Sequence, residues 1–86
     1  MPKQITVYTK PDCVQCEYTK KWLARRSLPF NEIDVVEHPV FAEQLREQGI
    51  SQMPYVVAGD QKWSGFKLDR IRGLDPKDYS LSLIHI

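Results

Sequence analysis

The 86-residue sequence has almost no net charge, no long hydrophobic run and only two cysteines. Its net charge is only +1, from 12 basic and 11 acidic residues, which excludes the large positive field that nucleic acid or an anionic membrane requires. No run of about 18 apolar residues predicts a membrane span, and the N-terminal apolar run is too short for a signal-peptide core. We therefore expect one soluble, cytoplasmic, monomeric domain with a modest core.

Cysteine is also scarce, and both cysteines, Cys13 and Cys16, lie within four residues. A disulfide between them would close almost no loop, so it would contribute little chain-entropy stabilisation. A reducing cytosol also makes purely structural disulfides rare. A stapling role is therefore the weakest interpretation of the pair.

A metal site is a second interpretation, because two thiolates at this spacing can share a tetrahedral zinc. Zinc then needs two more ligands, and the only histidines, His38 and His85, are far apart in the sequence. A closed zinc site would need an outside ligand. An iron–sulfur cluster shared between two chains stays open as an alternative, with visible absorbance as its test.

A redox role requires the first cysteine to lie at a helix start. Residues 4–8 predict a strand, and Pro11 predicts a turn after it. Apolar residues then recur at helical spacing, which predicts a helix ending near residues 27–29 with this buried stripe: Val14, Tyr18, Trp22 and Leu23. Cys13 is then at the helix N-terminus, where free N–H groups and the helix dipole stabilise a thiolate by about 0.3–2 kcal/mol. Lys10 adds to this effect, and Asp12 and Glu17 oppose it.

The remaining chain predicts further alternation of strands and helices. Residues 29–35 predict a strand, 38–49 a helix, 53–66 a hairpin with a Gly-Asp turn, and 67–74 a last helix. The expected order is βαβαββα, an α/β fold.

At this point the sequence resembles known redox proteins. The segment "YTKPDCVQC" is similar to the active-site segment of glutaredoxins, and the whole order resembles the thioredoxin fold, a four-stranded mixed sheet flanked by three helices. The combination of "CVQC" with "MPYVVAGDQKWSGFKLDRI" resembles the NrdH redoxins, glutaredoxin-like proteins that donate electrons to class Ib ribonucleotide reductase. The resemblance covers Ile5 to Leu74, so we expect a domain at 1–74 and a tail of unknown structure at 75–86.

The resemblance implies roles for individual residues. Cys13 is expected to be the attacking thiolate and Cys16 the resolving thiol, and the Met53–Pro54 bond is expected to be cis and to face them. Further contacts to substrate or partner are expected from residues near this pair: Lys10, Val14, Gln15, Met53, Pro54, Trp63, Ser64, Gly65 and Phe66. Trp63 has a structural interpretation of equal weight, because a buried indole can serve packing alone.

The resemblance also implies partners. Thioredoxin reductase is the expected reductant and class Ib ribonucleotide reductase the expected acceptor; NADPH and flavin belong to the reductase, and no cofactor or metal is expected in this chain. Glutathione is expected to bind weakly or not at all, because Lys67 stands where glutathione-binding relatives carry acid. The alternatives are a glutathione-dependent or iron–sulfur-binding glutaredoxin, and an arsenate-reductase-like regulatory binding module, whose chains are longer.

Two other segments have plainer interpretations. Glu17, Lys21 and Arg25 fall at i, i+4 and i+8, which predicts a solvated, charge-paired helix face rather than a docking surface. Phe41 and Leu45 predict ordinary helix packing. The tail carries a β-like run, Leu81, Leu83, Ile84 and Ile86, with no counterpart in the family.

Overall fold

The computed structural model describes residues 3–80, and its centre is a four-stranded sheet in the order β2-β1-β3-β4. Strand β1 (Ile5–Thr9) pairs in parallel with β2 (Asn31–Asp34) and antiparallel with β3 (Tyr55–Ala58). Strand β4 (Gln61–Ser64) pairs antiparallel with β3. The predicted mixed sheet is confirmed.

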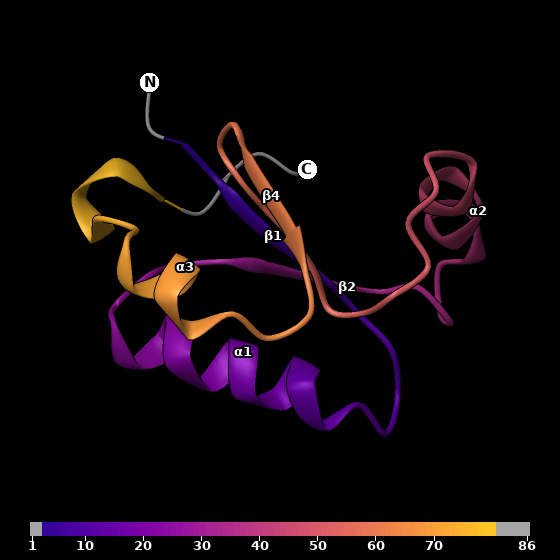
Figure 1. Ribbon diagram of the computed structural model, residues 1–86, viewed down its shortest axis with the longest axis horizontal. Helices are drawn as coiled ribbons and strands as arrows, with labels where there is room; N and C mark the ends of the chain where they lie inside the picture. The colour runs from indigo at the N-terminus through magenta and orange to yellow at the C-terminus, as the bar shows by residue number, and fades with distance from the viewer. Residues whose placement is uncertain (1–2, 81–86) are drawn as a thin grey trace.

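Helices cover both faces of this sheet (Figure 1). Helix α1 (Val14–Arg25) and helix α3 (Leu68–Arg72) pack side by side on one face. Helix α2 (Pro39–Glu47) lies on the other face, and a short 3₁₀ helix, η1 (Pro76–Asp78), follows α3. The order of strands and helices through α3 is βαβαββα, as predicted.

The sheet has one core cluster on its α1 and α3 face and another on its α2 face, because side chains alternate between the two faces along β1. Ile5 and Val7 are fully buried and join the larger core cluster against α1 and α3, whereas Tyr8 points to the α2 side. Burial and the neighbouring Tyr55 raise the pKa of Tyr8. On the α2 side, Leu45 is buried and Phe41 is half-buried, which confirms the predicted packing of this helix.

The predicted buried stripe of α1 is confirmed at its second half, Trp22 and Leu23, and wrong at its first half, Val14 and Tyr18. Val14 is 67% exposed and Tyr18 49% exposed, whereas the buried residues of the helix are Cys16, Thr19 and Leu23. Their spacing of three and four residues is helical, but two of the three are small and were not counted as core formers. Leu23 belongs to both sets, and Trp22 is half-buried and packs against the same core cluster.

The first six residues of the predicted tail are part of the folded unit. Tyr79 is 7% exposed and packs into the larger core cluster, and it forms a parallel β-bridge with Lys3. Lys3 N donates to Asp78 O at 2.8 Å, and Ser80 N donates to Lys3 O at 2.9 Å. The β-like run and His85 fall in 81–86, outside the described residues.

Among the helices within residues 3–80, none is long and apolar enough to cross a membrane.

Candidate active site

The turn after β1 places Cys13 at the start of α1. Asp12 adopts a left-handed conformation with φ 58°, which aspartate tolerates better than most residues, and the chain then turns into the helix. Cys13 is the N-cap residue, and its Sγ accepts a hydrogen bond from Cys16 N at 3.1 Å. The predicted position at the helix N-terminus is confirmed. A thiolate on Cys13 would therefore meet backbone donors and the positive end of the helix dipole.

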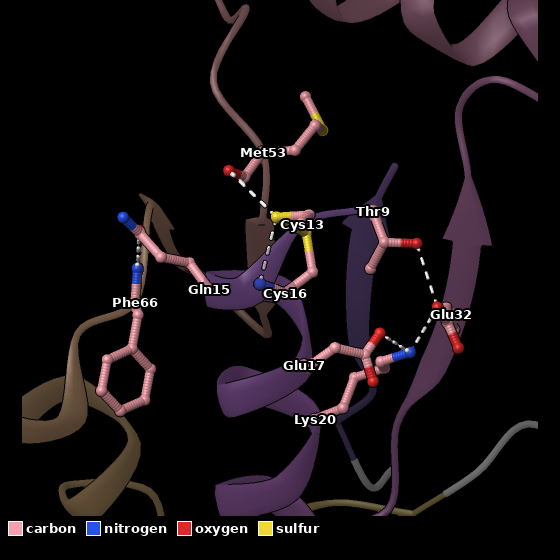
Figure 2. Close-up of a disulfide and its surroundings, with 9 residues drawn as sticks. All are labelled: Thr9, Cys13, Gln15, Cys16, Glu17, Lys20, Glu32, Met53 and Phe66. Atoms are coloured by element: carbon pink, nitrogen blue, oxygen red, sulfur yellow. Dashed lines mark hydrogen bonds and ion pairs between the residues drawn. A yellow bond between two sulfur atoms is a disulfide. The ribbon is translucent and has the colours of Figure 1, made fainter. Parts of the chain in front are cut away.

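The two cysteines are joined as a disulfide but differ in access (Figure 2). Their Cα atoms are 5.2 Å apart. Cys16 is fully buried among core residues, whereas Cys13 is partly exposed. Of the two cysteines, only Cys13 reaches the protein surface.

The segment before β3 faces this disulfide. The Met53–Pro54 peptide bond is cis, and Met53 O lies 3.8 Å from the Sγ of Cys13, so both the predicted isomer and the predicted location are confirmed. The side chain of Met53 is 9% exposed and packs near Cys16. Met53 therefore faces the disulfide with its backbone while its side chain fills the core.

The turn after β4 forms the other side of the site. Phe66 N donates to Gln15 Oε1 at 3.1 Å, and Gly65 N donates to Pro54 O at 2.7 Å. The ring of Phe66 lies 5.8 Å, centroid to centroid, from that of Tyr18. The structure thus brings Gln15, Pro54, Gly65 and Phe66 together around the cysteines.

The remaining predicted contacts are more dispersed. Trp63 is 5% exposed and belongs to the core, so its side chain does not form a docking surface and its structural interpretation is supported. Ser64 is half-buried at the end of β4, opposite Tyr55. Val14 is exposed beside Cys13, in a shallow hollow. Lys10 lines a separate groove of about 390 Å³ that runs from Met53 along α2.

A polar cluster that the sequence did not predict lies between α1 and β2. Lys20 Nζ lies 3.0 Å from a carboxylate oxygen of Glu17 and 2.9 Å from one of Glu32, and Thr9 Oγ1 donates to the same Glu32 oxygen at 3.0 Å (Figure 2). Hydrogen bonding to Glu32 is the main cause that raises the pKa of Lys20.

The pairing predicted for this helix face therefore needs a correction. Glu17 pairs with Lys20 at i+3 instead of Lys21 at i+4, because Lys20 leans toward β2. Arg25 lies over the ring of Trp22, 5.4 Å from its centroid, in a cation–π contact. One signal was available for the cluster: Thr9 is a polar residue in a strand that alternates buried and half-buried positions, and its hydroxyl needs a partner there.

No group of three or more His, Cys, Asp or Glu side chains that could hold a metal ion occurs within residues 3–80.

The family model for glutaredoxin matches residues 5–63. The chain belongs to the glutaredoxin family. Within that family it is of the NrdH type: it is 47% identical over 79 residues to the glutaredoxin-like protein NrdH of Escherichia coli strain K12, which covers 92% of this chain and 98% of the relative. A glutaredoxin-like protein NrdH of Lactococcus lactis subsp. cremoris is 41% identical over 63 residues, covering 73% of this chain and 88% of the relative.

A solved structure agrees with these matches. The NrdH-redoxin of Escherichia coli, a glutaredoxin-like protein with a thioredoxin-like activity profile, superposes with a TM-score of 0.81 at 49% identity, over 85% of this chain and 96% of that one. Together with the paired cysteines of the "CVQC" segment, the comparisons identify a thiol-disulfide oxidoreductase of the thioredoxin fold.

Proposed function

We propose that this glutaredoxin-like protein carries electrons from thioredoxin reductase to class Ib ribonucleotide reductase through the Cys13–Cys16 pair. The observation that carries the proposal is the unequal access of the two sulfurs: Cys13 is partly exposed at a helix N-terminus, and Cys16 is fully buried beneath it. An exposed attacking thiol with a buried resolving thiol suits exchange with a protein disulfide.

The exchange takes two steps. The Cys13 thiolate attacks one sulfur of the partner's disulfide, that S–S bond breaks, and the partner's other sulfur leaves and takes up a proton. Cys16 then loses its thiol proton and attacks the Sγ of Cys13, which breaks the mixed disulfide and releases the partner's second thiol. The partner gains two electrons and two protons, and this protein is left as the disulfide. The dithiol of the reductase reverses the change, with NADPH and flavin bound to that enzyme and no cofactor in this chain.

The partner's disulfide segment is expected to bind along Met53. The Met53 backbone lies outside the ladders of β3, which begin at Tyr55, and its carbonyl faces Cys13. An extended segment that pairs with this backbone gains main-chain hydrogen bonds while its cysteine reaches Cys13. The affinity then depends little on the partner's side chains, as a carrier serving two different enzymes requires.

Glutathione is expected to bind weakly and to be a poor reductant of this protein. Lys67 is exposed at the N-cap of α3, directly after Phe66, so its charge lies on the side of the site formed by this turn. The α-amino group of a small peptide bound there would meet a positive charge. Losing one charge-assisted hydrogen bond costs about 1.5–3 kcal/mol, equivalent to roughly ten- to a hundredfold weaker binding.

A coupled assay tests the proposal. NADPH oxidation is followed with the purified protein and either thioredoxin reductase or glutathione plus glutathione reductase, and a Cys13→Ser variant supplies the blank. We expect micromolar thioredoxin reductase to reduce the protein faster than millimolar glutathione does. Equal or faster reduction by glutathione would contradict the proposed reductant. Delivery to the acceptor is measured as nucleotide reduction by class Ib ribonucleotide reductase supplied with this protein as sole dithiol.

The role of Lys67 is tested in the same assay. Lys67→Glu should raise the rate with glutathione, and Lys62→Glu, the same charge change at an exposed position of β4, should not. If both variants behave like the wild-type protein, the preference does not arise from this charge.

A further inference from the structure

Two hydrogen bonds join three segments that are distant in the sequence. Gln15 Oε1, in the first turn of α1, accepts from Phe66 N at 3.1 Å. One residue earlier, Gly65 N donates to Pro54 O at 2.7 Å. The turn after β4 is therefore bonded on one side to the segment between the two cysteines and on the other side to the segment before β3.

A third contact closes these segments into a ring. Met53, next to Pro54 in the chain, places its carbonyl oxygen 3.8 Å from the Sγ of Cys13. Cys13 lies two residues before Gln15, where the ring began. Figure 2 shows Gln15 and Phe66 on the side of the cysteines opposite to Thr9 and Glu32.

We propose that Gln15 is a positioning residue for the partner-binding backbone of Met53. Its carboxamide oxygen fixes the Gly65–Phe66 turn, and this turn fixes the Pro54 carbonyl and with it the Met53 backbone beside Cys13. Gln15 makes no reaction step itself. The inference rests on the proposed exchange with an extended protein segment, and it assigns to the second variable residue of "CVQC" a part in binding that segment.

Local geometry favours an acceptor at this position. Gly65 has φ +85°, a left-handed conformation that suits glycine, and a Cβ built there would lie 3.4 Å from Gln15 Oε1. The carboxamide therefore packs directly against the turn as well as bonding to it. The Tyr18–Phe66 ring contact holds the same turn to α1 one helical turn later, so loss of the hydrogen bond should loosen the turn without detaching it.

The test compares two substitutions of glutamine. Gln15→Met keeps the side-chain length and removes the acceptor. Gln52→Met is the matched control, because Gln52 is exposed, its Nε2 lies 3.6 Å from the same built Cβ, and no hydrogen bond of its side chain occurs within residues 3–80. With thioredoxin reductase as the enzyme and this protein as its disulfide substrate, we expect Gln15→Met to raise the KM for this protein by about two- to tenfold, the equivalent of one net hydrogen bond. The kcat of the reductase should be unchanged. Gln52→Met should leave both constants unchanged.

Hydrogen exchange of the Phe66 amide gives a second measurement. Exchange should be faster in Gln15→Met and should stay slow in Gln15→Glu, which keeps an acceptor oxygen at the same reach. The proposal is overturned if KM is unchanged in Gln15→Met, if kcat falls instead of KM rising, or if Gln52→Met raises KM equally.

A second substrate separates this inference from the proposed function. The same variants are assayed on insulin disulfides with dithiothreitol as the reductant, where no reductase is involved. A wild-type protein that reduces insulin but is not reduced by thioredoxin reductase would refute the proposed electron donor alone. The positioning role of Gln15 would still be tested, because the KM for insulin should rise in Gln15→Met and not in Gln52→Met.

Discussion

At the scale of single residues, the proposed mechanism gives Cys13 and Cys16 different roles because they differ in exposure. A sulfur that is fully buried cannot approach a disulfide on another protein, but it lies next to its neighbour in the same helix turn. In the proposed mechanism, packing therefore assigns attack to Cys13 and resolution to Cys16. The sequence predicted the helix start that separates the two positions, because strand, turn and helix signals agree there.

Replacement of each cysteine should give different products. Cys16→Ser should accumulate a mixed disulfide between Cys13 and a partner disulfide, since no second thiol can release it, whereas Cys13→Ser should trap nothing. Non-reducing electrophoresis of each variant with excess oxidised partner measures the trapped species. Equal trapping by the two variants would contradict the assigned roles.

At the scale of elements, α1 shows where sequence reasoning reached its limit. Its existence, its start after Cys13 and its approximate end were predicted, because hydrophobic spacing and Pro29 define them. Its buried face was predicted only in part, at Trp22 and Leu23, because the small side chains of Cys16 and Thr19 carry no hydrophobic signal in the sequence although they are buried. Val14 is exposed beside Cys13, and the ring of Tyr18 contacts Phe66 of the turn after β4 instead of entering the core.

Two substitutions in α1 should separate stability from binding. Leu23→Ala should lower the free energy of unfolding by about 2–5 kcal/mol, because Leu23 is fully buried against the sheet. Val14→Ala should change the free energy of unfolding by less than about 0.5 kcal/mol, because Val14 is exposed. It should nevertheless raise the KM of thioredoxin reductase for this protein, because Val14 lies beside Cys13. Urea unfolding and steady-state kinetics measure the two effects. A large loss of stability in Val14→Ala would contradict the exposed placement.

The Lys20 cluster joins α1 to β2, and its contribution should depend on pH. Lys20 has a pKa raised above 10.5, chiefly by its hydrogen bond to Glu32, so its stabilisation is complete below the ordinary lysine pKa and is lost as pH rises through the folded-state value. Lys20→Met should therefore cost about 0.5–1 kcal/mol near pH 8, and the difference from wild type should shrink above pH 10.5. Urea unfolding at several pH values measures it. A difference that grows with alkaline pH would contradict this account.

At the scale of the whole molecule, the folded unit extends past Leu74, where the resemblance predicted from the sequence alone ended, to residues 75–80. The sequence predicted the sheet, the helices and their order, since each has a local pattern. It did not predict that Tyr79 enters the core, because a lone aromatic residue after a Pro-Lys-Asp turn carries no periodic signal. It also could not predict the hydrogen bond between Gln15 and Phe66, which are 51 positions apart. Contacts of this kind depend on the assembled fold.

Tyr79 should therefore contribute to stability. Tyr79→Ala should lower the free energy of unfolding by about 3 kcal/mol, because a nearly buried aromatic ring is removed from the core. Tyr79→Phe keeps the ring and should cost less than about 1 kcal/mol. Both values come from urea unfolding. A Tyr79→Ala variant as stable as the wild-type protein would show that residues 75–80 are dispensable for the domain.

The hydrogen bonds between Lys3 and residues 78–80 also make the protein a candidate for circular permutation. They bring the two ends of the described chain together at the start of β1, whereas the cysteines follow its other end. The Gly59–Asp60 turn lies at the same end as Lys3, because Ala58 pairs with Ile5. A short linker joining the ends, with the chain reopened at this exposed turn, should leave every contact of the redox site intact. The thiol chemistry would then be carried by a chain that begins at β4.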